Sequence, residues 1–102
     1  MNISSLLGSV SLNTPDTVNR YLAYSESKAA LNQQSRSLHR ILLKDGITVN
    51  PVHPGWVRTD MGGSNADISV EESAEGLLRV FNGLNEDSNG KFLAWNGNEI
   101  PW

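Results

Sequence analysis

The sequence predicts an α/β fold in which short parallel strands alternate with helices. Helical periodicity spans residues 21–44 and 70–82, and strand-like segments lie at residues 47–52 and 91–95. This alternation is typical of βαβ units, whose strands run parallel and whose helices cover the sheet. The length of 102 residues, with 38% hydrophobic and 19% charged residues, suits one globular domain.

The first helix is expected to follow a long loop. Residues 6–20 are rich in Ser, Asn, Thr, Gly and Pro, which predicts irregular structure. We expect the helix to begin at Tyr21 and to end at Lys44, because Asp45 and Gly46 form a stop signal. Its apolar positions fall on one side of a 3.6-residue period: Ala30, Leu31, Leu38, Ile41 and Leu42.

The second half of the chain predicts a strand, a long loop, a helix and a last strand. Residues 47–52 are β-branched, although Pro51 cannot donate to a ladder, and residues 54–67 form a glycine-bearing loop. Ser69 and Glu72 make a capping box for a helix that ends at Asn82, before Gly83. The stripe expected to be buried on this helix is Val70, Ala74, Leu77, Leu78 and Phe81.

Charge and composition argue against several kinds of partner. The net charge of −3 disfavours nucleic acid and anionic membranes, and no apolar run approaches the roughly 18 residues of a membrane span. Without cysteine there is no disulfide. His39 and His53 lack the neighbours of a metal site, so no metal is expected, and His39 is expected on the surface. A cytoplasmic protein fits these features best.

Tyr24 and Lys28 form the most informative pair in the sequence. They are four residues apart within the expected helix, so their polar heads share one face. A fixed positive charge beside a phenol favours the phenolate, which allows proton transfer near neutral pH. Because a solvated helical pair has the same spacing, the assignment depends on the neighbouring motifs.

Two motifs flank this pair. Residues 2–5 read Asn-Ile-Ser-Ser, and residues 50–60 read Asn-Pro-Val-His-Pro-Gly-Trp-Val-Arg-Thr-Asp. The ordered trio resembles the second half of the short-chain dehydrogenase/reductase family, in particular its carbonyl-reductase branch with the C-factor-like proteins. The resemblance implies a first strand over residues 1–5. The expected order is then strand, helix, strand, helix, strand, the C-terminal half of a Rossmann-type doubly wound parallel sheet.

The family's glycine-rich dinucleotide-binding motifs do not occur in this sequence. It contains neither Gly-x-Gly-x-x-Gly nor Asn-Asn-Ala-Gly. We therefore expect residues 1–102 to form a partial Rossmann domain that lacks the N-terminal dinucleotide-binding half. The first strand of such a half is expected to leave an open sheet edge.

The resemblance implies an NAD(P)(H)-dependent oxidoreductase of the carbonyl reductase or alcohol dehydrogenase type. Tyr24 would be the general acid/base for hydride transfer, and Lys28 would hold the nicotinamide ribose, so both contact the cofactor. Ser5 would donate a hydrogen bond to the substrate oxygen. Three other serines compete for this role: Ser4, Ser9 and Ser11.

The loop after the second strand would complete the site. The resemblance implies cofactor contacts from Pro54, Gly55, Val57 and Thr59. Trp56 and Met61 are expected at the substrate pocket, where the indole favours an aromatic or apolar ketone. The substrate would be a small carbonyl compound or alcohol, and NADP is favoured over NAD.

Other interpretations of the sequence stay open. A hydrolase built from Ser5, His53 and Asp60 lacks the Gly-x-Ser-x-Gly elbow, and His53 is expected to be structural or to line a pocket. The chain could instead be a catalytically inactive fragment, or an interaction or signalling module that uses the open edge. The family's use of the corresponding helix implies a homodimer through residues 21–44.

Overall fold

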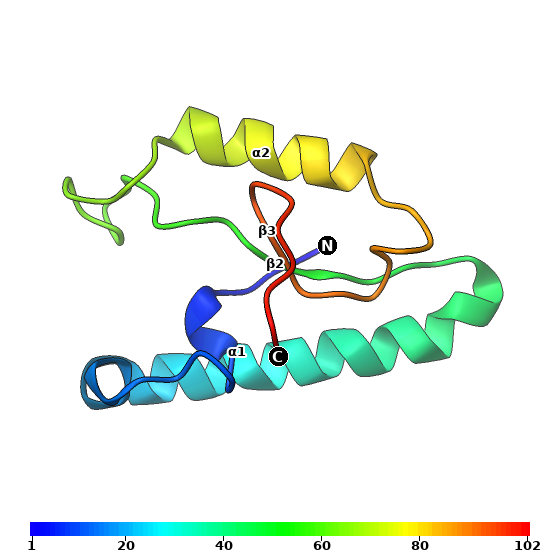
Figure 1. The fold of residues 1–102 in the computed structure, drawn as a ribbon, viewed down its shortest axis with the longest axis horizontal. Helices are drawn as coiled ribbons and strands as arrows, with labels where there is room; N and C mark the ends of the chain where they lie inside the picture. The colour runs from blue at the N-terminus through cyan, green and yellow to red at the C-terminus, as the bar shows by residue number, and fades with distance from the viewer.

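Three short parallel strands lie between two helices in the computed structural model (Figure 1). The structure describes the main chain of residues 1–102 and all side chains except those of residues 17–19. The strands are β1 (Asn2–Ile3), β2 (Pro51–His53) and β3 (Leu93–Ala94), in the order β1-β2-β3. The helix α1 covers one face of the sheet and α2 the other, which confirms the predicted α/β architecture.

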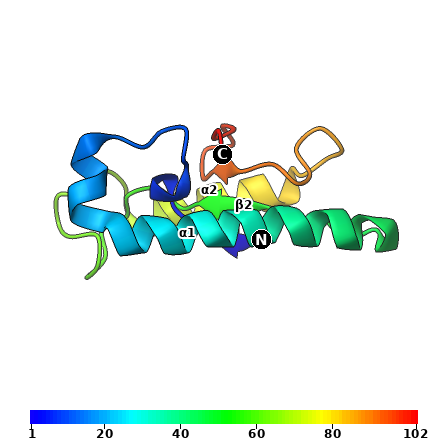
Figure 2. The ribbon, with the colours of Figure 1, turned by 90° about the horizontal axis from the view of Figure 1, so that it is seen from below.

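The first long helix, α1 (Pro15–Leu42), begins earlier than predicted. Proline suits the first helical position because the missing N–H would be unpaired there anyway. The expected start at Tyr21 is instead a kink, with φ −134° and ψ 28°, and Figure 2 shows the first turns bending away from the rest. The expected loop of residues 6–20 thus contains the start of α1 and a 3₁₀ turn, η1 (Leu6–Gly8).

The C-terminal end of this helix agrees with the sequence. A second 3₁₀ turn, η2 (Leu43–Asp45), follows directly, and Gly46 ends it with a left-handed φ of 74°. The buried face of α1 differs from the prediction, because Asn32 and Ser35 are buried whereas Ala30 and Ile41 are exposed. The remaining predicted positions, Leu31, Leu38 and Leu42, are partly buried.

The strands are shorter than the segments predicted for them, residues 1–5, 47–52 and 91–95. β2 is the central strand, and Pro51 is its first residue, a position where a missing N–H is tolerated. Pro51 lies opposite Asn2 on β1, and His53 lies opposite Ala94 on β3. The last residues of all three strands therefore meet at one end of the sheet, which we call the carboxyl end.

The second long helix, α2 (Val70–Asn82), has the predicted capping box at Ser69 but not the predicted buried face. Ser73, Gly76 and Val80 are buried, because the helix lies so close to Trp95 that a Cβ at position 76 would come within 2.6 Å of its ring. Of the stripe predicted to be buried, only Leu77 packs on the core, and four residues are exposed: Val70, Ala74, Leu78 and Phe81.

Two small apolar clusters form the core. One joins Val52, Val80 and Leu93, with Leu77 and Leu84 packed against it. The other joins Phe92, Ala94 and Ile100, and Trp102 packs on it with ring centroids 5.9 Å from Phe92. The guanidinium of Arg36 lies 5.0 Å from the Trp102 ring centroid. Within the described part of the chain, neither helix is sufficiently long and apolar to cross a membrane.

At the opposite end of the sheet, which we call the amino end, polar side chains bond to neighbouring segments of the main chain. The buried Asn50 side chain donates to the carbonyls of Ser88 and Lys91, both at 2.8 Å. His39, predicted at the surface, is half-buried, and its Nδ1 accepts from the Val49 amide at 3.3 Å. These bonds fasten the segment before β2 to α1 and to the turn before β3.

Candidate functional site

The predicted common face of Tyr24 and Lys28 is confirmed. The Lys28 ammonium lies 5.6 Å from the centroid of the Tyr24 ring, and both residues are partly buried. The same ammonium donates to the Ile3 carbonyl at 3.1 Å. Lys28 is therefore tied to the carboxyl end of β1 while its ammonium lies beside the aromatic ring of Tyr24.

Ser5 lies immediately beyond β1 as the N-cap of η1. It is buried, and its Oγ accepts a hydrogen bond from the Leu7 amide at 3.2 Å. A hydroxyl that accepts in this way keeps its own proton available for a second bond. Ser5 can therefore donate to a substrate oxygen without giving up its contact with the turn.

The three competing serines donate their hydroxyl protons elsewhere. Ser4 donates to Asn32 Oδ1 at 2.5 Å, Ser9 to the Pro101 carbonyl at 2.6 Å, and Ser11 to the Trp102 carbonyl at 2.7 Å. Among the described contacts of these four serines, Ser5 is the one whose hydroxyl is not a donor. This difference favours Ser5 over its neighbours, although its role stays a prediction.

Asn32 is a residue of the site that the sequence interpretation missed. It is buried one turn along from Lys28, where it accepts from Ser4 and donates to the Gly8 carbonyl at 3.3 Å. These two bonds hold the turn after β1 against α1. The signal was present as a polar repeat at every fourth position, Tyr24, Lys28 and Asn32, which marks one helix face.

The loop after β2 turns sharply at Gly55. Its φ is 89°, and a Cβ there would lie 2.5 Å from Ile68 and 3.0 Å from Trp95. Pro54 precedes this turn, and its carbonyl accepts from the Ser73 hydroxyl of α2 at 2.6 Å. The two residues thus direct the loop away from the end of β2, as a structural turn requires.

The predicted binding residues of this loop lie in a segment closed by its own bonds. The Trp56 indole donates to the Gly62 carbonyl at 2.8 Å, and the Thr59 hydroxyl accepts from the Gly62 amide at 3.0 Å. Val57 pairs with Ile68 in an isolated bridge. Trp56 is 50% exposed and Met61 is 81% exposed, so both side chains lie open to solvent.

His53 ends β2 and connects the neighbouring strands. Its Nδ1 accepts from the Leu6 amide at 3.1 Å, and its carbonyl accepts from the Trp95 amide at 2.8 Å. Burial lowers the pKa of His53 from its ordinary value of 6.5. The Nδ1 lone pair is already used to accept from Leu6 and the proton of the neutral ring lies on Nε2, so neither nitrogen is free to accept the proton of Ser5.

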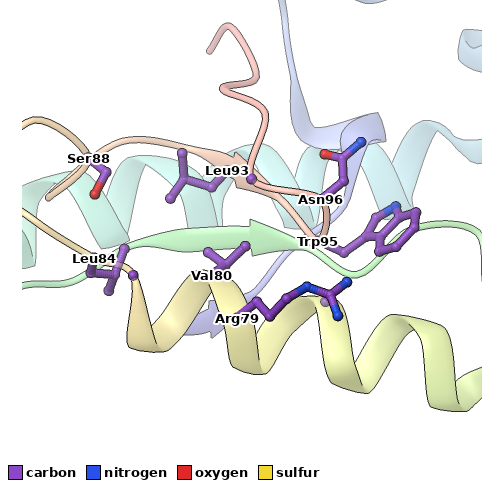
Figure 3. Close-up of a pocket in the computed structure, with 10 residues that line it drawn as sticks. Arg79, Val80, Leu84, Ser88, Leu93, Trp95 and Asn96 are labelled. Atoms are coloured by element: carbon purple, nitrogen blue, oxygen red, sulfur yellow. The ribbon is translucent and has the colours of Figure 1, made fainter.

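Two pockets lie on the described surface, and neither is lined by a predicted site residue. The larger, about 330 Å³, lies between α2 and the turn after β3, where Arg79, Val80, Leu84 and Trp95 line it (Figure 3). It contains none of the predicted site residues. The smaller, about 140 Å³, lies between the η1 segment and α1, and its lining includes Leu7 and Ser25, the neighbours of the Ser5 turn and of Tyr24. Neither lining includes Ser5, Tyr24 or Lys28, so we place the candidate site outside both pockets, at the carboxyl end of the sheet where Lys28 bonds to Ile3.

A metal-binding arrangement is not found among the described side chains. Among the residues with described side chains, no three His, Asp or Glu lie together as ligands would. The charged pairs near the loop are exposed, such as Arg58 with Glu72 at 3.8 Å.

Comparisons with known proteins identify relatives of this chain in sequence and in fold. A sequence-family model described as enoyl-(acyl carrier protein) reductase matches residues 2–79. The C-signal protein of Myxococcus xanthus is 42% identical over 101 residues, which cover 99% of this chain and 59% of that protein.

Two solved structures share the fold across 98% of this chain, each with a TM-score of 0.88. The carbonyl reductase Sniffer of D. melanogaster is 38% identical, and the chain covers 39% of it. The NADPH-bound carbonyl reductase from chicken fatty liver is 40% identical, and the chain covers 41% of it. The chain therefore spans 59% or less of the length of these relatives.

Proposed function

The chain belongs to the short-chain dehydrogenase/reductase family, on its carbonyl-reductase and C-factor branch, and we propose that it carries the proton-transfer residues of an NADP(H)-dependent carbonyl reductase. The observation that carries the proposal is the Lys28 ammonium, 5.6 Å from the Tyr24 ring and bonded to the end of β1. Small carbonyl compounds or the corresponding alcohols are the substrates.

The donors that are present fit a nicotinamide nucleotide. An ammonium has three N–H donors, and one described bond, to Ile3, uses one of them. The other two can bind neighbouring ribose hydroxyls at the carboxyl end of the sheet, where ligands of open α/β sheets bind. When bound, the nicotinamide supplies the hydride.

The residues of this chain then handle the proton. As the carbonyl carbon is reduced, Tyr24 gives its phenolic proton to the developing alkoxide, and Lys28 stabilises the phenolate that is left. Ser5 donates to the same oxygen and fixes its direction. In the reverse reaction Tyr24 accepts the proton of the alcohol.

Cofactor binding by the chain itself tests this proposal. NADPH is titrated into the purified protein while its fluorescence is followed. Lys28→Met should weaken binding about tenfold or more, because a hydrogen bond from a charged donor contributes about 1.5–3 kcal/mol. The control Lys91→Met removes a lysine whose described partner is Glu99, and it should leave binding unchanged. Equal affinity of the two variants would contradict the cofactor site.

An interaction module is a second candidate, and one observation favours it. The amides of Asn2 and Ser4 bond to β2, so the N–H of Ile3 points to the other edge of β1, on the side where the Ile3 carbonyl accepts from Lys28. Ile3 is 49% exposed, so this edge can accept a further strand. A protein that associates through this edge without binding NADPH would support the second candidate over the first. Ile3→Pro, which removes the outward N–H, should then abolish association in light scattering.

A further inference from the structure

The His53 side chain joins two neighbouring strands at the carboxyl end of the sheet. It is the last residue of β2, and its Nδ1 accepts from the Leu6 amide, in the turn that follows β1. Leu6 directly follows Ser5, so this bond fixes the peptide that connects the two residues. The main chain of His53 is bonded on its other side to Trp95.

The donor determines the protonation state of the ring. A main-chain amide can only donate, so Nδ1 must be unprotonated and the proton of the neutral ring must lie on Nε2. A second proton would place an N–H on Nδ1 against the N–H of Leu6. Protonation of the ring therefore breaks the hydrogen bond between the Leu6 amide and Nδ1. Because the donor is a main-chain amide, the bond does not depend on the side chain of Leu6.

We propose that His53 is a positioning residue, which holds the Ser5–Leu6 peptide and through it aims the Ser5 hydroxyl at the substrate oxygen. This inference rests on the proposed carbonyl reduction. Positioning Ser5 is a different role for His53 from lining a pocket or serving as the base of a hydrolase. Acid should release the turn, because the imidazolium cannot accept.

Few ionisable groups surround the ring. β1, η1 and β3 contribute none, and α1 contributes Tyr24 and Lys28, whose ammonium is bonded to Ile3. On α2 and the loop before it, Arg58 pairs with Glu72 and Arg79 with Glu75. The other carboxylates of these segments are exposed and have no described ion pair: Asp60, Asp67 and Glu71. Among the described side chains, no carboxylate bonds to the imidazole. Burial, which lowers the pKa of His53, is therefore uncompensated.

Two substitutions separate the bond from the charge. The side-chain oxygen in His53→Asn stands near the place of Nδ1, so it can accept from Leu6, and it does not titrate between pH 5 and 8. His53→Leu has no acceptor. His39→Asn is the matched control, since His39 also accepts a main-chain amide through Nδ1 but lies at the amino end of the sheet.

The first measurement needs no turnover. In ¹⁵N-labelled protein, the Leu6 amide resonance should titrate together with the His53 ring at a midpoint below pH 6.5. The resonance should stay constant in His53→Asn and be displaced at every pH in His53→Leu. His39→Asn should titrate like the parent. A ring with its proton on Nδ1, or a Leu6 amide that ignores the ring, would overturn the proposal.

The second measurement is the pH profile of kcat for carbonyl reduction in the protein that carries this chain. The parent should lose kcat as His53 becomes protonated, and His53→Asn should remove this acidic limb. His53→Leu should lower kcat about tenfold at all pH values, with the KM for NADPH unchanged, as loss of one hydrogen bond predicts. An acidic limb that persists in His53→Asn overturns the role in reduction. Absence of turnover despite a titrating Leu6 amide refutes the proposed function instead, and leaves His53 as the anchor of the turn.

Discussion

The two ends of the sheet use the same kinds of polar bond for different purposes. At the amino end, Asn50 donates twice to main-chain carbonyls and His39 accepts a main-chain amide. At the carboxyl end, His53 accepts a main-chain amide and Lys28 donates to a main-chain carbonyl. Each end thus has one histidine acceptor and one side-chain donor bonded to the backbone of a neighbouring segment.

The difference lies in what the bonded side chains leave free. Both Nδ2 bonds of Asn50 are directed at the protein, and the residue is 1% exposed. Lys28 is only partly buried and keeps donors for another molecule, and the Ser5 hydroxyl keeps its proton. The amino end should therefore contribute chiefly to stability and the carboxyl end chiefly to chemistry.

The largest expected effect is at the carboxyl end. Tyr24→Phe removes the proton donor and should lower kcat for carbonyl reduction about 10²–10⁴-fold in the protein that carries this chain. Urea unfolding should change little, because the ring and its contact with Lys28 remain. The control Tyr21→Phe changes the exposed tyrosine at the kink of α1 and should keep full activity. Unchanged turnover in Tyr24→Phe would refute the proton-transfer role.

The amino end should show the opposite behaviour. Asn50→Ala leaves two carbonyls unpaired in a buried place and should lower the free energy of unfolding by about 2–3 kcal/mol, measured by urea denaturation. NADPH affinity under native conditions should not change. Asn82→Ala, at the exposed end of α2, should cost less than about 0.5 kcal/mol. A loss of NADPH affinity in Asn50→Ala would contradict the expectation that the amino end contributes to stability and not to cofactor binding.

The cap of α2 tests whether the carboxyl end also contributes stability. Ser69→Ala removes a bond to the Glu72 amide and should cost about 1 kcal/mol in urea unfolding. Bonds from the main chain and side chain of Ser69, with Arg58 nearby, lower the pKa of Glu72. The ionised form is thus favoured by folding, so this contribution is present above pH 4.5 and is lost as the pH falls through the lowered pKa. The variant should lose less stability than the parent between pH 5 and pH 3, and equal losses would contradict this.

The smallest effect is expected between the two ends. Arg36→Gln removes the guanidinium from the face of Trp102 and should cost about 0.5–1 kcal/mol, followed by thermal unfolding. Arg40→Gln, one turn further along α1 and exposed, is the control and should be neutral. If Arg36→Gln lowered kcat while the melting temperature stayed the same, the segment around Trp102 would act on the site. The connection would then run through Ser9 and Ser11, whose hydroxyls bind that segment.

Local features of the sequence predicted the parts that depend on local chemistry. The shared face of Tyr24 and Lys28 follows from helical spacing, and the capping box at Ser69 follows from two residues in one turn. The buried face of α2 did not follow, because the close approach of Trp95 to Gly76 is a tertiary contact that reverses the apolar pattern.

The bond between His53 and Leu6 could not be predicted either. The two residues are 47 positions apart in the sequence, and they meet only because β1 and β2 pair in parallel. The place of Pro51 in the central strand could not be predicted for the same reason. The strand register makes Pro51 the first residue of β2, where a missing N–H is tolerated. Sequence patterns thus predicted candidate groups for the site, and the strand register determined which of them lie together.

The acceptor that holds Lys28 is a peptide oxygen and not a side chain. Genetic drift at position 3 can exchange isoleucine for another residue without deleting that oxygen, so the ammonium keeps its anchor through many neutral substitutions. The orientation of Lys28 therefore depends on the path of the backbone at position 3 and not on which side chain is present there.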